Sequence, residues 1–280
     1  MINNAITGLG FGSISSLLYV FDMYLNTSVD LLTKDIFAGG NDAFGTIFTL
    51  VKEVKEVVTP ISLEILALLF LIEFLKMTIK YDVLKFEHFI KIFFKFSIAK
   101  GAMDISETFL DLIYSISCKW IKGIGDIGEQ FSFVEYAKSG LETLEDYNII
   151  EQISFNMTSG YLFPIILLSG IIMMVIAYAR IFEIMCYIAI SPLPCAFIVQ
   201  ENCRITLKFF LSYTAVCLQG VFMVLSIQIV RCLAQNIFTT EYQNVETTLV
   251  YIYNMVIISV LSLFVMAKSN QWASKVLDAM

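Results

Sequence analysis

Long apolar segments occupy most of this 280-residue chain and constrain its fold more than any other feature. Hydrophobic residues make up 58% of the chain and charged residues 15%, against roughly 45–50% and about 25% in soluble domains. A helix needs about 20 apolar residues to cross a bilayer, and the runs lack the alternation of transmembrane β-strands. The sequence therefore predicts an all-α, polytopic membrane helical bundle. The six segments lie at about residues 57–79, 89–117, 157–179, 184–199, 205–237 and 247–267.

Ionised side chains lie inside these segments or at their edges. A charge at the centre of a bilayer costs at least about 2.5–3.5 kcal/mol on insertion scales, so such residues usually face protein or water. We therefore expect the helices to enclose something polar. The residues concerned are Glu73, Lys100, Asp104, Arg180, Glu183 and Arg231.

The second segment is the least compatible with lipid. At 100° per residue, Lys100, Asp104, Glu107 and Asp111 fall within one narrow sector of a helix. Two interpretations remain open. The charged stripe lines a shared aqueous path, or Lys100 and Asp104 form an internal pair one turn apart that packs against another helix.

The short fourth segment carries Pro192 and Pro194 in its middle. Two prolines remove two backbone donors, and broken backbone at membrane depth is tolerated only in protein or at a cavity. We expect a re-entrant segment with the prolines at its tip, in addition to five full spans. With the N-terminus outside and the C-terminus inside, every basic cluster then obeys the positive-inside rule.

Two regions follow from this topology. Residues 1–56 form an extracytoplasmic or interfacial amphipathic N-terminal region, and residues 57–280 form the transmembrane bundle, with an acidic extracytoplasmic loop at 118–152. Pro60 is expected in the first turn of the first span, where a missing N–H costs little. Gly123, Gly125 and Gly128 are expected to end the second span.

Catalytic chemistry is not indicated. Gly40 and Gly45 have the spacing of a phosphate-binding loop, but Thr46 stands where that loop needs lysine. His88 is the only histidine, so a histidine-based triad or zinc protease motif has no basis. We expect no enzyme activity, no cofactor and no metal site.

A specific string of residues runs from the end of the third segment through the fifth. It contains Tyr178-Ala-Arg180-Ile-Phe-Glu183, Ser191-Pro192-Leu193-Pro194, Gln219-Gly220 and Gln235-Asn236-Ile237. In this order the steps resemble the TrbL-like polytopic inner-membrane subunit of type IV secretion systems, in the version carried by conjugative elements of Gram-positive bacteria. Ala179 departs from that pattern, which has glycine there.

The resemblance implies a channel subunit in the cytoplasmic membrane of a bacterium. It would help to pass single-stranded DNA with an attached relaxase, or protein, across the membrane. Partner ATPases and other secretion subunits would supply energy and structure, and the chain would form a homo-oligomer in contact with lipid and with the moving substrate.

The resemblance also gives hypotheses for single residues. Arg180 and Glu183 would form an ion pair that fixes a corner, or line the cytoplasmic mouth, and Gln219 and Gln228 would hydrogen-bond between helices. Arg231 is a further candidate in or near the pathway.

Two other functions compete with the channel hypothesis. A secondary permease for a small solute would use a midplane site built on the fourth segment and the charges of the second. A non-conducting assembly scaffold would have no conduit of its own.

Overall fold

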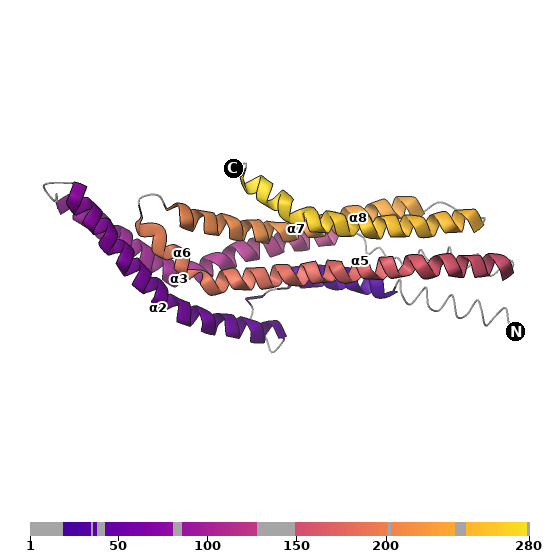
Figure 1. Cartoon of the computed structure of the whole chain (residues 1–280), viewed down its shortest axis with the longest axis horizontal. Helices are drawn as coiled ribbons and strands as arrows, with labels where there is room; N and C mark the ends of the chain where they lie inside the picture. The colour runs from indigo at the N-terminus through magenta and orange to yellow at the C-terminus, as the bar shows by residue number, and fades with distance from the viewer. Residues whose placement is uncertain are drawn as a thin grey trace. The chain divides into compact units, whose positions relative to one another are not determined.

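The computed structural model describes residues 19–34, 36–37, 43–80, 86–127, 149–200, 203–238 and 245–278. Every regular element in these ranges is helical, which confirms the predicted all-α class (Figure 1). Residues 19–33 are helical. The elements that follow are α2 (Ala43–Lys80), α3 (Phe86–Ile127), α5 (Ile149–Ile190), α6 (Pro192–Cys195), η2 (Ala196–Val199), α7 (Arg204–Phe238) and α8 (Val245–Asp278).

Four helices in the described part of the chain are long and apolar enough to cross a membrane. They are found at Phe44–Ile79 in α2, Gly160–Ile190 in α5, Arg204–Leu233 in α7 and Tyr253–Leu277 in α8. The charges of α3 keep it out of this set, so five full spans and the predicted orientation stay predictions. At about 1.5 Å per residue, helices of this length exceed a hydrocarbon core of about 30 Å. They must tilt or extend beyond it.

The first span begins earlier than its apolar run suggests. The prediction that Pro60 lies in the first turn of this helix is wrong. Because α2 starts at Ala43, Pro60 lies in the helix interior. Proline cannot donate to the carbonyl four residues earlier and crowds it, which bends helices. Figure 1 shows α2 bent along its length. The predicted boundary at residue 57 falls inside this continuous helix and stays a prediction.

Two other expected helix ends are also wrong. Gly123 and Gly125 lie inside α3, which continues to Ile127. Glycine costs a helix only about 1 kcal/mol relative to alanine, so a long helix can carry it. Gly128 and most of the predicted acidic loop lie outside the described residues.

The third and fourth apolar segments are partly one helix. α5 runs without interruption through Arg180 and Glu183 to Ile190. The predicted break at the prolines is confirmed: the chain turns at Ser191, and Pro192 and Pro194 lie in the short helix α6, which η2 follows. Re-entry of this segment into the membrane stays a prediction.

The described chain divides into two compact units. The first comprises Met1–Lys34, Lys119–Ala179 and Gln219–Trp272, and the second comprises Asp35–Cys118, Arg180–Leu218 and Ala273–Met280. Helices α3, α5, α7 and α8 each contribute to both units.

The second unit has a core where α2 and α3 meet the proline segment. Its fully buried members are Leu66 of α2, Ala99 and Met103 of α3, and residues of α6 and η2. The Phe70 and Phe96 rings pack edge to face with centroids 5.2 Å apart. The broken segment is therefore held by apolar burial as well as by its backbone.

Candidate functional site

A polar cavity lies between α2 and α3 in the second unit. Its volume is about 300 Å³. That is room for on the order of ten water molecules at their share of liquid volume. The lining residues are Lys52, Lys55, Glu56 and Thr59 of α2 and Met103, Asp104 and Glu107 of α3.

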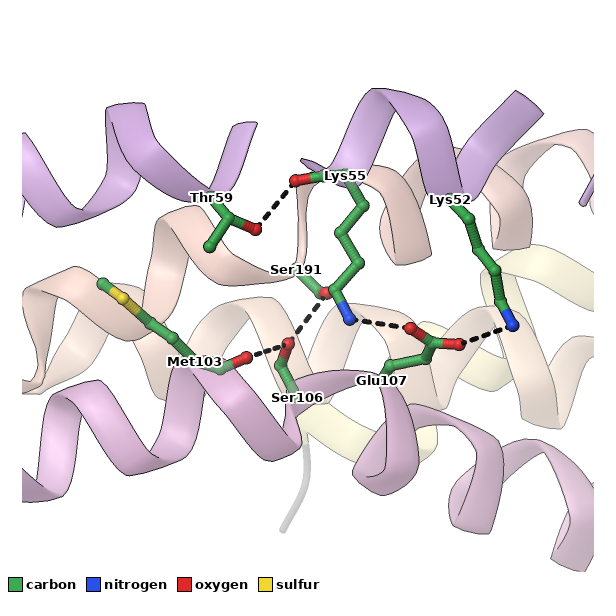
Figure 2. A network of polar contacts seen from close by, with 7 residues as sticks. All are labelled: Lys52, Lys55, Thr59, Met103, Ser106, Glu107 and Ser191. Atoms are coloured by element: carbon green, nitrogen blue, oxygen red, sulfur yellow. Dashed lines mark hydrogen bonds and ion pairs between the residues drawn. The ribbon is translucent and has the colours of Figure 1, made fainter. Parts of the chain in front are cut away.

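The Glu107 carboxylate forms ion pairs with two lysines of α2, the facing helix. Its carboxylate lies 2.7 Å from the Nζ atom of Lys55 and 3.6 Å from that of Lys52 (Figure 2). Lys55 is 15% exposed and Glu107 27%, whereas Lys52 is half exposed and also lies over the Phe48 ring. Water screens the closer pair least, so it carries most of the electrostatic attraction.

The cavity keeps an excess of negative charge. Glu56 and Asp104 add two carboxylates to that of Glu107, against the two lysines. Among the described residues, however, no cluster of histidine, cysteine or acidic side chains could hold a metal ion. The arrangement can hold water, a small cation or a basic side chain.

Serine and threonine hydroxyls tie α3 and α7 to the proline segment. The Ser106 hydroxyl donates to the Met103 carbonyl, and its oxygen lies 3.1 Å from the Ser191 oxygen, at the break between α5 and α6 (Figure 2). Thr206 of α7 donates to the Pro194 carbonyl at 2.6 Å. These bonds give buried polar groups partners where regular helix ends.

Arg180 holds α5 against α7. Its Nε and one terminal nitrogen donate to the carbonyls of Val216 and Cys217, both at 3.0 Å, and the side chain is 2% exposed. A helix carbonyl can accept this second bond because it has two lone pairs. The hypothesised pair with Glu183 is absent from the ion pairs of the described residues: Arg180 points inward to α7, while Glu183 lies exposed.

Only part of the charged stripe on α3, which comprises Lys100, Asp104, Glu107 and Asp111, gathers at the cavity. Asp104 and Glu107 line the cavity, and Asp111 is half-buried. Lys100 and Asp104 are exposed, and the internal pair that was one interpretation is absent from the ion pairs of the described residues. The alternative, an aqueous path, stays open.

Gln219 and Arg231 belong to the first unit. Arg231 donates to the Asn26 side-chain oxygen at 2.6 Å, which ties α7 to the helix at 19–33. The buried Gln219 side-chain oxygen has no partner in the described part of the chain. Of the two glutamines predicted to bond between helices, Gln228 does so: its side-chain nitrogen donates to the carbonyl of Gly125 in α3 at 3.2 Å.

The two lysines of the cavity were missed from the sequence. Lys52 and Lys55 fall in the region that we assigned to the N-terminal part, because the apolar run begins only at residue 57. A signal was present: Lys52, Lys55 and Thr59 recur at i, i+3 and i+7, which places them on one helix face. The same spacing brings Glu73 and Lys76 together further along α2, where a carboxylate oxygen and the Nζ atom lie 3.2 Å apart.

Comparison with known proteins gives one family. The model of a family described as TrbL/VirB6 plasmid conjugal transfer like protein matches residues 25–192, which is more than half of the chain. The match includes all of α2, α3 and α5, and so both walls of the cavity. No curated protein and no solved structure matches the chain.

Proposed function

The chain belongs to the TrbL/VirB6 plasmid conjugal transfer-like family, and on that premise we propose that it is a subunit of the translocation channel of a conjugative type IV secretion machine. The protein would lie in the cytoplasmic membrane of a bacterium and cross it several times. The four apolar helices support the membrane placement.

The observation that carries the channel role is the polar cavity between α2 and α3. Residues 57–72 of α2 contain one charge, Glu64. The cavity lies where this stretch begins, beside Lys52, Lys55 and Thr59. Polar groups beside an apolar span usually mark a path for ions or substrate. Water entering here from one membrane surface would reach the charged edge of α3.

The substrate would be single-stranded DNA with its attached relaxase, or a protein. The energy would come from partner ATPases, because the sequence has no complete phosphate-binding loop. Other secretion subunits and further copies of this chain would complete the conduit. Arg180 would keep α5 and α7 at fixed register around the broken segment.

Site-specific crosslinking in donor cells tests the role. A photoreactive residue at Asp104, in the cavity, is compared with one at Leu112, an exposed apolar position on the same helix. We expect DNA to be captured from position 104 during transfer and not from position 112. Transfer with no capture from position 104 would contradict the channel role and favour a scaffold.

A small-solute permease is the second candidate, because the cavity has mixed charge and the size of a small ligand. Solute uptake into liposomes that contain only this chain would favour it. Absence of uptake, with transfer lost in an Asp104 variant that accumulates normally, would favour the secretion subunit.

A further inference from the structure

Two opposite charges on the surface of the second unit lack partners among the residues that the structure describes. Glu64 of α2 and Lys100 of α3 are both exposed. Neither makes an ion pair or a hydrogen bond with any residue that the structure describes. Glu64 is the only charge in residues 57–72, and Lys100 makes no ion pair with Asp104, one turn further along α3. An unpaired charge is costly at membrane depth, so each of the two calls for a partner from outside.

Glu64 lies on the outer face of α2. It is flanked one turn away on each side by Ile61, which is 49% exposed, and Leu68, which is 57% exposed. Ser62 and Leu66, in contrast, are fully buried. At 100° per residue, these buried positions lie roughly opposite Glu64 around the helix axis. The carboxylate therefore points away from the core of its own unit.

Glu64 and Lys100 lie at the same level along the paired helices. Lys55 contacts Glu107 near one end of the pair and Phe70 contacts Phe96 further along, so α2 and α3 run antiparallel. Both helices rise by the same distance per residue. Counting inward from these two contacts places Glu64 level with the turn of α3 that contains Lys100.

The surface beside Lys100 allows a neighbouring helix to come close. Gly101 follows it, and a Cβ atom built there would meet nothing within 4 Å. Small residues of this kind let helix backbones approach each other in a membrane. A long lysine side chain beside an open glycine can reach a carboxylate on an adjacent helix.

From these observations we infer that Glu64 of one copy pairs with Lys100 of a second copy of this chain. Copies related by rotation about the membrane normal keep every residue at its own depth, so two charges at one level can meet between neighbours. The contact is head to tail, because α2 of one copy meets α3 of the next, and such contacts close into a ring when the rotation between copies divides a full turn. The inference rests on the membrane placement of the proposed function, but not on which substrate is moved.

Charge reversal in two differently tagged full-length copies tests this pairing. In Glu64→Lys both positions carry positive charge, and in Lys100→Glu both carry negative charge. Each variant should therefore repel its own kind. When the two are expressed together, every contact between unlike copies pairs Lys with Glu, and no copy can form the pair within itself.

Co-purification from membranes in mild detergent is the measurement. We expect wild-type copies to co-purify, each variant to lose co-purification with its own kind by at least about tenfold, and the mixture to recover it. Undiminished self-association of either variant, or a mixture that does not recover, would overturn the inference. Glu53→Lys is the matched control, since it lies three turns away on the same outer face of α2 and should change nothing.

Milder variants cover the case in which charge reversal prevents accumulation. Glu64→Gln and Lys100→Gln keep size and polarity, and each should reduce co-purification several-fold at normal membrane levels. Unchanged co-purification of both would overturn the pairing. Transfer is scored separately: copies that associate through these residues but support no transfer would count against the proposed function and leave the interface standing.

Discussion

The Nζ atom of Lys55 in α2 lies 2.7 Å from a carboxylate oxygen of Glu107 in α3, although the two residues are 52 positions apart in sequence. Both side chains are mostly withdrawn from water. Since a hydrogen bond to a charged group fixes both distance and direction, this pair sets the register of the two helices beside the cavity.

We expect Glu107→Gln to lower the free energy of unfolding by about 1.5–3 kcal/mol, the range for hydrogen bonds to charged groups. The variant leaves Lys55 with a weaker, uncharged acceptor. A double-mutant cycle with Lys55→Gln, measured by denaturation of the detergent-solubilised protein, should give a coupling of at least about 0.5 kcal/mol.

Lys52→Gln is the control for this pair. Its Nζ atom is 3.6 Å from Glu107 and its side chain is half exposed, so its loss should matter little. Equal effects of the two lysine variants, or strictly additive effects of Lys55→Gln and Glu107→Gln, would contradict the assignment.

The class of the fold could be predicted from the sequence because hydropathy alone distinguishes spanning helices. Helix ends were harder, as α2 and α3 show. α2 begins at Ala43 because charged residues such as Lys52 continue the helix without being apolar, and α3 tolerates Gly123 and Gly125 at modest cost. Apolar runs therefore mark where a helix meets lipid and not where it begins.

The site could be predicted only in part. Spacing on one helix placed Asp104 and Glu107 on a common face, and both line the cavity. The partners of the charged residues could not be predicted in this way. Lys55, which pairs with Glu107, lies on another helix, and Arg180 donates to backbone carbonyls of α7. Contacts between helices depend on packing, which a periodicity within one segment does not contain.

Arg180 should be among the most sensitive positions in the second unit. We expect Arg180→Ala to destabilise the protein by about 3 kcal/mol or more, because it removes two hydrogen bonds and leaves a cavity. Arg180→Met should cost less, since an apolar side chain of similar length fills the space without the cost of burying a charge. Thermal unfolding in detergent, followed by fluorescence, compares the two.

Glu183→Gln separates this anchor from the ion pair that the sequence had suggested. Because Arg180 uses carbonyls of α7, the Glu183 variant should keep wild-type stability to within about 0.5 kcal/mol. A loss equal to that of Arg180→Ala would restore the ion-pair hypothesis.

A threonine hydroxyl of α7 bonds to the short helix that follows the break after α5. Thr206 donates to the Pro194 carbonyl at 2.6 Å, and it is buried. Thr206→Val keeps the shape but removes the donor, so we expect a loss of about 1–2 kcal/mol. Thr206→Ser keeps the donor and should lose less. The reverse order, measured by the same thermal unfolding, would show that the methyl group matters more than the bond.

Gly170 of α5 packs closely against the helix at 19–33. A Cβ atom built there would lie 2.9 Å from a ring carbon of Phe21, which is 1% exposed. Gly170→Ala should therefore push the helix at 19–33 away from α5 and cost about 1–3 kcal/mol, as overpacking does. Gly160→Ala is the matched control on the same helix, because nothing lies within 4 Å of its added Cβ atom. That change should be neutral or stabilise the helix by up to about 1 kcal/mol. If both alanine variants shift thermal unfolding in the same direction, close packing of Phe21 on α5 does not hold in solution.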